Sequence, residues 1–198
     1  MTQKKIKPQS ILQGNKPGDD PKKYGLKFDG GKARWDLVPM VELQSIIAVP
    51  TIYLECNERV KLTEFDRNDL YNVTMNIITD NEDVMFPIVG FNLFYLLRGK
   101  PYTVEELGAD NNELRWDLFD INEIQKVAEV YGYGAALYAP ENWKNVNRER
   151  YYSALLRHFK TIRTKERFDG ESGFLHLHHA IWNVIALMWL DNHKKGGA

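Results

Sequence analysis

The residues best suited to catalysis gather near the C-terminus. Four of the five histidines lie between His158 and His179, and such a concentration of titratable groups favours a site over scattered surface residues. Glu166, Asp169 and Glu171 fall close together within the same stretch. Neighbouring carboxylates repel one another unless a cation sits among them, and hard divalent ions prefer oxygen ligands. We therefore predict a Mg²⁺ or Mn²⁺ site; the alternative for Glu171 is a capping role at a helix N-terminus.

Three polar residues follow these carboxylates at helical spacing. His176, His179 and Asn183 stand at i, i+3 and i+7 in an otherwise apolar segment, so they form one stripe on a helix. A buried polar stripe costs stability unless its groups find partners. We interpret the stripe as part of the site, whereas His178 lies off it and is interpreted as structural.

A basic stripe precedes the carboxylates. Arg150, Arg157, Lys160 and Arg167 recur at steps typical of one helix face. A solvated face is the simpler interpretation, but cations beside a metal site suit a phosphate substrate. The helical spacing predicts that His158 faces inward.

Two loops carry weaker signals. Asn142 and Trp143 could stack against and read a nucleobase, although Trp143 could equally be a core residue. Lys32 follows Asp29-Gly30-Gly31 and could contact phosphate, but this motif alone is not a P-loop.

Composition limits the class of protein. The chain has 198 residues, a net charge of −1 and 43% hydrophobic residues, which is typical of a folded globular protein. The single cysteine, Cys56, excludes an internal disulfide or a zinc cluster built on cysteines. The N-terminus lacks the apolar core of a signal peptide, and the clean apolar run from Ala180 to Leu190 is too short to span a bilayer. We expect a cytoplasmic protein without membrane contact.

The elements that must position these residues are mostly helical. Apolar periodicity and capping residues predict helices over 39–49, 120–138, 148–165 and 171–192, with Pro50 ending the first and Gly132 and Gly134 bending or ending the second. Residues 70–78 fit either a helix or a strand, and the apolar run 85–97 stays unassigned. We predict a mainly α fold: an N-terminal arm over 1–31, then one helical catalytic domain over 32–198 carrying an inserted α+β or irregular segment at about 50–114.

A short internal sequence repeat supports the prediction of an insertion. The tetrapeptide Arg-Trp-Asp-Leu occurs at 34–37 and again at 115–118, and the two stretches share seven identities in 16 positions. We interpret this as a partial duplication around the inserted segment, with coincidence as the alternative.

Together these motifs resemble a known family. The blocks that carry the resemblance are Asp29–Pro39, Tyr133–Trp143, Arg150–His158 and Glu166–Asn183. They resemble the dATP/dGTP pyrophosphohydrolases of bacteriophages, a family similar to MazG-like all-α nucleoside triphosphate pyrophosphohydrolases. The resemblance covers residues 27–49 and 118–192.

The resemblance implies an enzyme, a hydrolase acting on acid anhydrides. It implies a helical bundle that uses Mg²⁺ or Mn²⁺ to hydrolyse dATP and/or dGTP to the monophosphate and pyrophosphate, adjusting the phage nucleotide pool in the host cytoplasm. It also implies a homo-oligomer, a dimer or tetramer, because such bundles bury apolar helix faces between subunits. Direct nucleic-acid binding is not expected, since the carboxylates would repel a phosphate backbone.

Within this resemblance each candidate residue has an expected role. The expected metal ligands are Glu166, Asp169, Glu171, His176 and Glu123. The expected catalytic residues are Arg157, which would neutralise charge on the phosphates, and His158 and His179, which would relay a proton. The expected substrate-binding residues are Lys32, Arg34, Tyr138, Asn142, Trp143, Lys144, Lys160 and Asn183.

One departure from the family keeps an alternative open. Gln125 and Lys126 stand where relatives tend to have acidic residues. The alternative is a protein with reduced catalysis that binds a nucleotide or a host protein on the same scaffold, as in counter-defence.

Overall fold

The protein is helical throughout the residues that the structure describes. This computed structural model describes residues 33–55, 62–64, 66–80, 84–108 and 114–194, and within these ranges it contains no β-strand beyond an isolated bridge between Phe168 and Leu175. The mainly α prediction is therefore confirmed. Lys32 and the expected arm lie outside the described residues. The helices are α2 (Met40–Ile47), α3 (Val49–Glu55), α5 (Arg67–Asp80), α6 (Phe86–Arg98), α7 (Val104–Leu107), α8 (Ile121–Tyr138), α9 (Arg148–Thr161) and α10 (His176–Lys194).

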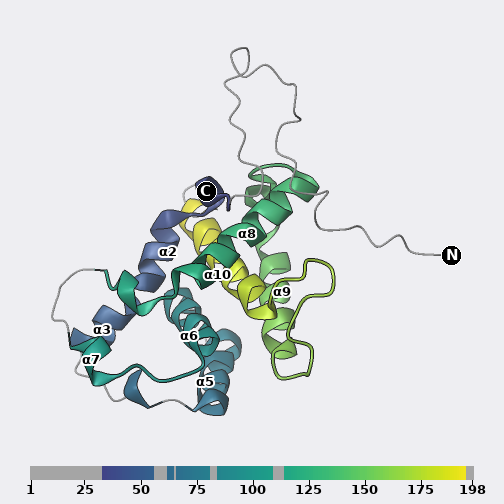
Figure 1. The fold of residues 1–198 in the computed structure, drawn as a ribbon. Helices are drawn as coiled ribbons and strands as arrows, with labels where there is room; N and C mark the ends of the chain where they lie inside the picture. Colours follow the sequence, from purple (N-terminus) through teal and green to yellow (C-terminus); the bar gives the residue numbers. More distant parts are fainter. Residues whose placement is uncertain (1–32, 56–61, 65, 81–83, 109–113, 195–198) are drawn as a thin grey trace.

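Helix α10 is the centre of the molecule. It packs against α9, α6 and α8 (Figure 1), and the segment from Ala180 to Met188 is buried at every position except Trp182. A helix that is apolar nearly all round is stable only when neighbours cover all its faces. Residues at the start of α10 are thereby held against α9 and α8. None of the described helices is long and apolar enough to cross a bilayer.

The expected insertion is helical and belongs to the core. The run that the sequence left unassigned forms α6, with Pro87 in its first turn and Gly99 ending it at φ 71°. Gly90 allows α6 to approach α2 closely, since a Cβ there would lie 2.5 Å from Ile46 Cδ1. The expectation of an α+β or irregular insertion was wrong for the described residues, because apolar side chains on most faces of α6 bury between α2 and α10.

The two copies of Arg-Trp-Asp-Leu fold alike. Each forms a short 3₁₀ turn, η2 (Trp35–Leu37) and η3 (Trp116–Leu118), and each is followed by a long helix, α2 or α8. In each copy the arginine makes a bidentate ion pair with the aspartate two residues later, with N–O distances from 2.6 to 2.9 Å. The shared geometry agrees with the predicted duplication.

The predicted helix ends differ from the observed ones. Asp120 caps α8 as expected, its side chain accepting from the Asn122 amide, but α8 continues through both glycines to Tyr138. Pro50 does not stop the helical path, because it falls in the first turn of α3, where its missing N–H is not needed. The stretch 70–78 is helix. The last helix begins at His176 rather than at 171, so the acidic residues before it lie in a loop.

Candidate active site

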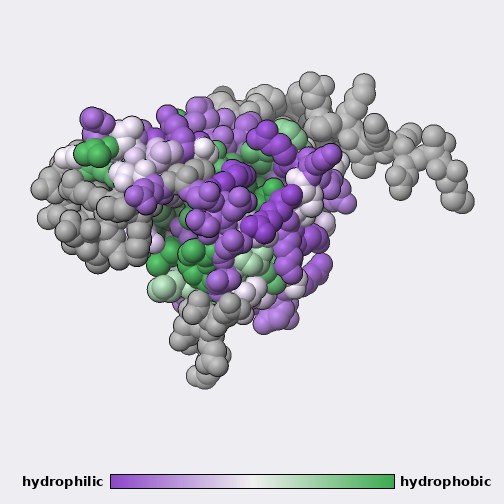
Figure 2. Space-filling model, turned by 90° about the horizontal axis from the view of Figure 1, so that it is seen from below, coloured by the Kyte–Doolittle hydropathy of each residue, from purple (hydrophilic) through white to green (hydrophobic). Residues whose placement is uncertain are grey.

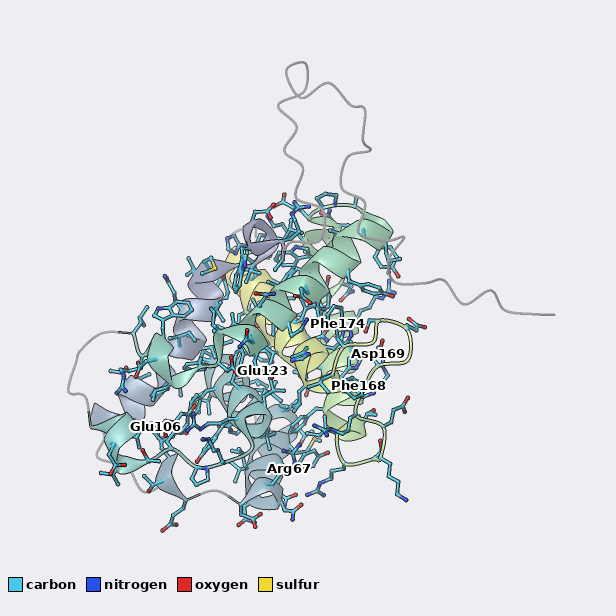
Figure 3. All side chains as sticks on the ribbon, in the orientation of Figure 1. Arg67, Glu106, Glu123, Phe168, Asp169 and Phe174 are labelled. Atoms are coloured by element: carbon cyan, nitrogen blue, oxygen red, sulfur yellow. The ribbon has the colours of Figure 1, made fainter. Side chains whose placement is uncertain are left out.

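A tight loop between α9 and α10 fixes the position of Asp169. The Asp169 amide donates to the Phe174 carbonyl at 2.8 Å, and the Gly173 amide donates back to the Asp169 carbonyl at 2.8 Å. Gly173 adopts φ 76°, a left-handed conformation that glycine accommodates without strain. The His176 amide then bonds the Arg167 carbonyl at 3.1 Å. These bonds hold Asp169 beside the first turn of α10 (Figure 3).

Asp169 lies next to a cluster of three histidines. His158 on α9 places its Nδ1 2.9 Å from Nδ1 of His176, and its ring stacks on that of His179 at 4.7 Å between centroids. Each of His158, Asp169 and His176 offers a ligand atom, and these atoms lie within 4.8 Å of one another. We call these three residues and His179 the histidine cluster. Of these four, His158, Asp169 and His176 form the one group of potential metal ligands found among the described residues.

Ser172 connects Asp169 to His179. Its hydroxyl donates to Asp169 Oδ1 at 2.8 Å and lies 2.7 Å from His179 Nε2. Because the hydroxyl hydrogen is directed to Asp169, Ser172 Oγ accepts a hydrogen from His179 Nε2. The chain His179–Ser172–Asp169 therefore sets the tautomer of His179 and can carry a proton along it.

Burial keeps the imidazoles of His158 and His179 neutral at neutral pH. Burial, with a further contribution from His179, lowers the pKa of His158 to about 3. Burial also lowers the pKa of His179 to about 4, against the opposing effect of Asp169. For Asp169, burial raises the pKa, but hydrogen bonds from Ser172 and the nearby histidines outweigh it and lower the value overall. The cluster thus combines neutral nitrogen donors with an ionised carboxylate.

This donor set fits a divalent transition ion. Neutral imidazole and carboxylate groups are the forms that bind metals, and Nε2 of the buried His176 has no hydrogen-bond partner among the described residues. A buried polar atom without a partner is costly, and coordination of an ion would remove that cost. Two imidazoles with one carboxylate differ from the all-oxygen ligand set that Mg²⁺ favours.

The predicted carboxylate cage is not formed. Glu166 and Glu171 are exposed in the loop, and neither joins Asp169 in a group of potential ligands within the described residues. The expectation rested on sequence proximity, but the loop directs Asp169 to the histidines while the two glutamates face solvent. Of the expected ligands, Asp169 and His176 lie together, and His158, expected to be catalytic, completes the group.

Glu123, the fifth expected ligand, pairs with a different histidine. Its Oε2 lies 2.6 Å from Nε2 of His178, which is buried at 5% side-chain exposure. Burial lowers the pKa of His178, against the raising effect of Glu123, so at neutral pH the contact is a hydrogen bond from a neutral imidazole to a carboxylate. The structural interpretation of His178 agrees with this contact.

The basic candidates lie at the edge of the cluster. Arg157 is exposed, with a guanidinium nitrogen 3.5 Å from Nε2 of His158. Lys160 is exposed one turn further along α9. Arg157 is therefore placed to meet an anion at the histidine cluster.

The remaining candidates have mixed placements. Trp143 packs edge-on against Tyr131 and Trp189, as the core alternative expected. Lys144 pairs with Glu141. Asn183 is buried one turn beyond His179 and donates to the carbonyl of that histidine at 2.6 Å.

Three candidates lie on the surface. Tyr138 is 72% exposed at the end of α8, and Asn142 is exposed in the 3₁₀ turn η4 (Asn142–Asn145). Arg34 is engaged with Asp36. The hydrogen bond described for Asn142 runs from its amide to the Ala139 carbonyl, not to the histidine cluster.

Two residues of the site were missed from the sequence. Ser172 bridges Asp169 and His179, and Tyr133 on α8 packs edge-on against Phe174 beside the loop. Burial raises the pKa of Tyr133, and the nearby charges of Glu171 and Asp169 add to this effect. The helix predicted over 171–192 included Ser172, whereas the structure places Ser172 in the loop before α10.

Comparison with known proteins identifies the C-terminal part of the chain. Residues 104–198 match the family model described as "dATP/dGTP diphosphohydrolase, N-terminal". A dATP/dGTP diphosphohydrolase of Salmonella phage PMBT28 is 28% identical over 85 residues, which are 43% of this chain and 29% of that protein. No solved structure matches. The resemblance predicted from the sequence is confirmed: from residue 104 onward, this chain is similar to the N-terminal domain of dATP/dGTP diphosphohydrolases.

Proposed function

We propose that the protein hydrolyses purine deoxynucleoside triphosphates, dATP and/or dGTP, to the monophosphate and pyrophosphate. The observation that carries this proposal is the coincidence of the family match with the histidine cluster: residues 104–198 include His158, Asp169, His176 and His179. The chain matches less than a third of its phage relative. The proposed hydrolysis is therefore argued from the chemistry of the clustered residues and not from the name of that relative.

A divalent ion held by His158, Asp169 and His176 would polarise phosphate oxygens as a Lewis acid. We propose Mn²⁺ rather than Mg²⁺, since two of the three donors are imidazoles. Glu166 and Glu171 are exposed in the loop and are not among these proposed ligands.

The surrounding side chains would bind the triphosphate and move the proton. Arg157, beside His158, would neutralise charge on the phosphate oxygens, with Lys160 one turn away. His179 would act as the proton carrier, because its Nε2 proton is directed through Ser172 to Asp169. Tyr133 and the exposed Tyr138 lie on the same side as the loop and are the aromatic residues best placed to contact a base.

The helical bundle is of the all-α nucleoside triphosphate pyrophosphohydrolase type in this proposal. The argument for a homo-oligomer is weaker than the sequence indicated. It assumed that a partner subunit would bury the apolar face of the last helix, but α6 of the same chain packs against α10. A dimer or tetramer stays a prediction, to be tested by light scattering after gel filtration.

The test is a product assay with matched variants. The protein is incubated with each dNTP and Mn²⁺ or Mg²⁺, and products are separated by ion exchange. We expect monophosphate and pyrophosphate from purine substrates, and a loss of at least about a hundredfold in Asp169→Asn and His176→Gln. The control is His193→Gln, an exposed histidine at the other end of α10. Mn²⁺ should raise the melting temperature of the wild type and control only.

Release of a single phosphate, or full activity in both cluster variants, would overturn the proposal. The alternative, nucleotide binding with reduced catalysis, has one observation in its favour. On α8, Gln125 and Lys126 both bond Glu129, so the acidic residue nearest those positions is already engaged. Tight dATP retention without product would support the alternative.

A further inference from the structure

A polar pocket lies where α5 and α6 meet the C-terminal end of α9. It has a volume of about 440 Å³ and is lined by residues of α5, α6 and the end of α9: Arg67, Asn68, Tyr71, Leu96, Ile162 and Arg163. The first four of these precede residue 104, where the family match begins. The pocket therefore joins the part of the chain outside the match to the part inside it, and the proposed hydrolysis uses none of its residues.

Two arginines face this pocket without an acidic partner. Arg67 donates through Nη1 to the Leu96 carbonyl at 3.0 Å, and Arg163 donates through Nη2 to Asn72 Oδ1 at 2.8 Å. Both acceptors are neutral, and neither arginine forms an ion pair with another described residue. The lining contains no carboxylate. Two cations sharing a small space repel each other, so an anion between them would be stabilised.

Stacked rings hold one of the arginines in place. The guanidinium carbon of Arg163 lies 3.9 Å above the ring of Tyr71, and that ring stacks on Phe159 at 4.6 Å between centroids. Phe159 is fully buried. The guanidinium is thus fixed on a rigid base, which reduces the entropy lost when it binds a ligand.

The donor arrangement suits a phosphate group. A guanidinium has five N–H donors in a planar fork that matches phosphate oxygens two at a time, and each arginine here donates one hydrogen bond to a described residue. Asp66, the nearest acid at the start of α5, directs Oδ1 to the amides of Asn68 and Asp69. That carboxylate is therefore occupied and does not line the pocket.

The pocket is separate from the histidine cluster and open to solvent. In Figure 3, Arg67 lies at the lower end of the molecule, apart from Asp169 beside the α9–α10 loop. Figure 2 shows the molecule from that lower side, where hydrophilic side chains predominate over a smaller hydrophobic area. A small polar ligand fits such a surface better than a docked apolar helix.

We propose that Arg67 and Arg163 form a second, phosphate-binding site, which takes the phosphate group of a small anion. The ligand is inorganic phosphate, pyrophosphate or a nucleoside monophosphate; all three present the same tetrahedral oxygens. Their binding does not require the metal centre, so the site stands or falls independently of the proposed hydrolysis.

The test is calorimetric titration of the full chain in the presence of EDTA, which keeps the histidine cluster free of metal. Phosphate, pyrophosphate and dAMP are titrated separately into the wild type, Arg67→Gln and Arg163→Gln. We expect each substitution to weaken binding about tenfold or more, because each removes a charge-assisted contact. Arg150→Gln, an exposed arginine of α9 outside the pocket, is the control for loss of net charge. His176→Gln should bind as the wild type does.

The three ligands identify the source of the phosphate. Tighter binding of dAMP than of phosphate assigns the pocket to a nucleotide, and tighter binding of pyrophosphate assigns it to a diphosphate. Circular dichroism of each variant checks folding, and Arg163→Lys, which keeps the charge but loses the fork, should bind with intermediate affinity. Equal affinity in the wild type, Arg67→Gln and Arg163→Gln, or no binding of any of the three ligands by the wild type at millimolar concentration, would overturn the proposal.

Discussion

Acidification should unfold the metal-free protein because two clustered histidines resist protonation. His158 and His179 have folded-state pKa values of about 3 and about 4, whereas an unfolded histidine titrates near 6.5. Between about pH 4 and 6.5 the unfolded chain binds protons that the folded chain does not. Folding stability therefore falls as the pH falls through this window, and is independent of these two residues above about pH 7.

The slope gives the size of the effect. One histidine that charges only on unfolding changes the free energy of unfolding by about 1.4 kcal/mol per pH unit. His158 and His179 together give an upper bound of about 5 kcal/mol between pH 6.5 and 4.5. That amount is comparable with the whole stability of many domains, about 5–15 kcal/mol. The lowered pKa of Asp169 acts below this window, where its own protonation costs further stability.

The assay is urea denaturation at half-unit steps from pH 7.5 to 4.5, followed by circular dichroism in EDTA. His158→Gln and His179→Asn should each remove about half of the slope that these two residues contribute, with the buried His178 adding to the slope in all variants, even though both substitutions lower the stability at neutral pH. The matched control, His193→Gln, changes an exposed histidine and should leave the slope intact. A wild type whose stability is flat over this range, or a His158→Gln variant with an unchanged slope, would refute the reasoning.

Three further predictions concern packing and pairing. Gly90→Ala should lower the free energy of unfolding by about 1–3 kcal/mol, because its Cβ would meet Ile46 Cδ1, and Ile46→Val should recover part of the loss in urea denaturation. Arg115→Ala should cost about 2–4 kcal/mol, since that side chain is 4% exposed, against under about 1 kcal/mol for Arg34→Ala at 36%. Glu123→Gln should keep turnover within about threefold in the product assay, because Glu123 bonds His178 and not the metal group.

The histidine stripe could be predicted because helical spacing alone determines it. His176 and His179 are three residues apart, so any helix through this segment puts them on one face. The apolar residues around them determine that this face is covered. The inward orientation of His158 followed from the same argument on α9, and the structure confirms it with the 2.9 Å contact to His176.

The carboxylates could not be placed because a loop has no period. Which of Glu166, Asp169 and Glu171 turns inward depends on the bonds between Asp169 and Phe174 and on the left-handed Gly173. Those bonds also delay the start of α10 to His176. The sequence pattern predicted helix from residue 171 onward, and it does not show which side chain the loop directs to the histidines.

The nature of the insertion was hidden for another reason. The run that forms α6 is apolar on nearly every face, and such a run has no amphipathic period by which to distinguish a buried helix from a buried strand. Pro87 and Gly90 both read as helix breakers. In the structure Pro87 stands in the first turn of α6, where its missing N–H is not needed. Gly90 lies where α6 approaches α2, and its lack of a side chain leaves room for Ile46.

The duplicated segments give a reason why Glu123 bonds His178 rather than joining the histidine cluster. In both copies the same glutamate, Glu42 in the first and Glu123 in the second, points from its helix to α10. Glu42 accepts from Asn192 Nδ2 at 3.1 Å, and Glu123 bonds His178 at 2.6 Å. Asn192 lies about four turns along α10 from the histidine cluster, so the first copy keeps this glutamate where the described residues form no group of potential metal ligands. In both copies the glutamate therefore bonds its helix to α10. The histidine cluster beside the second copy depends instead on residues of α9 and of the loop before α10.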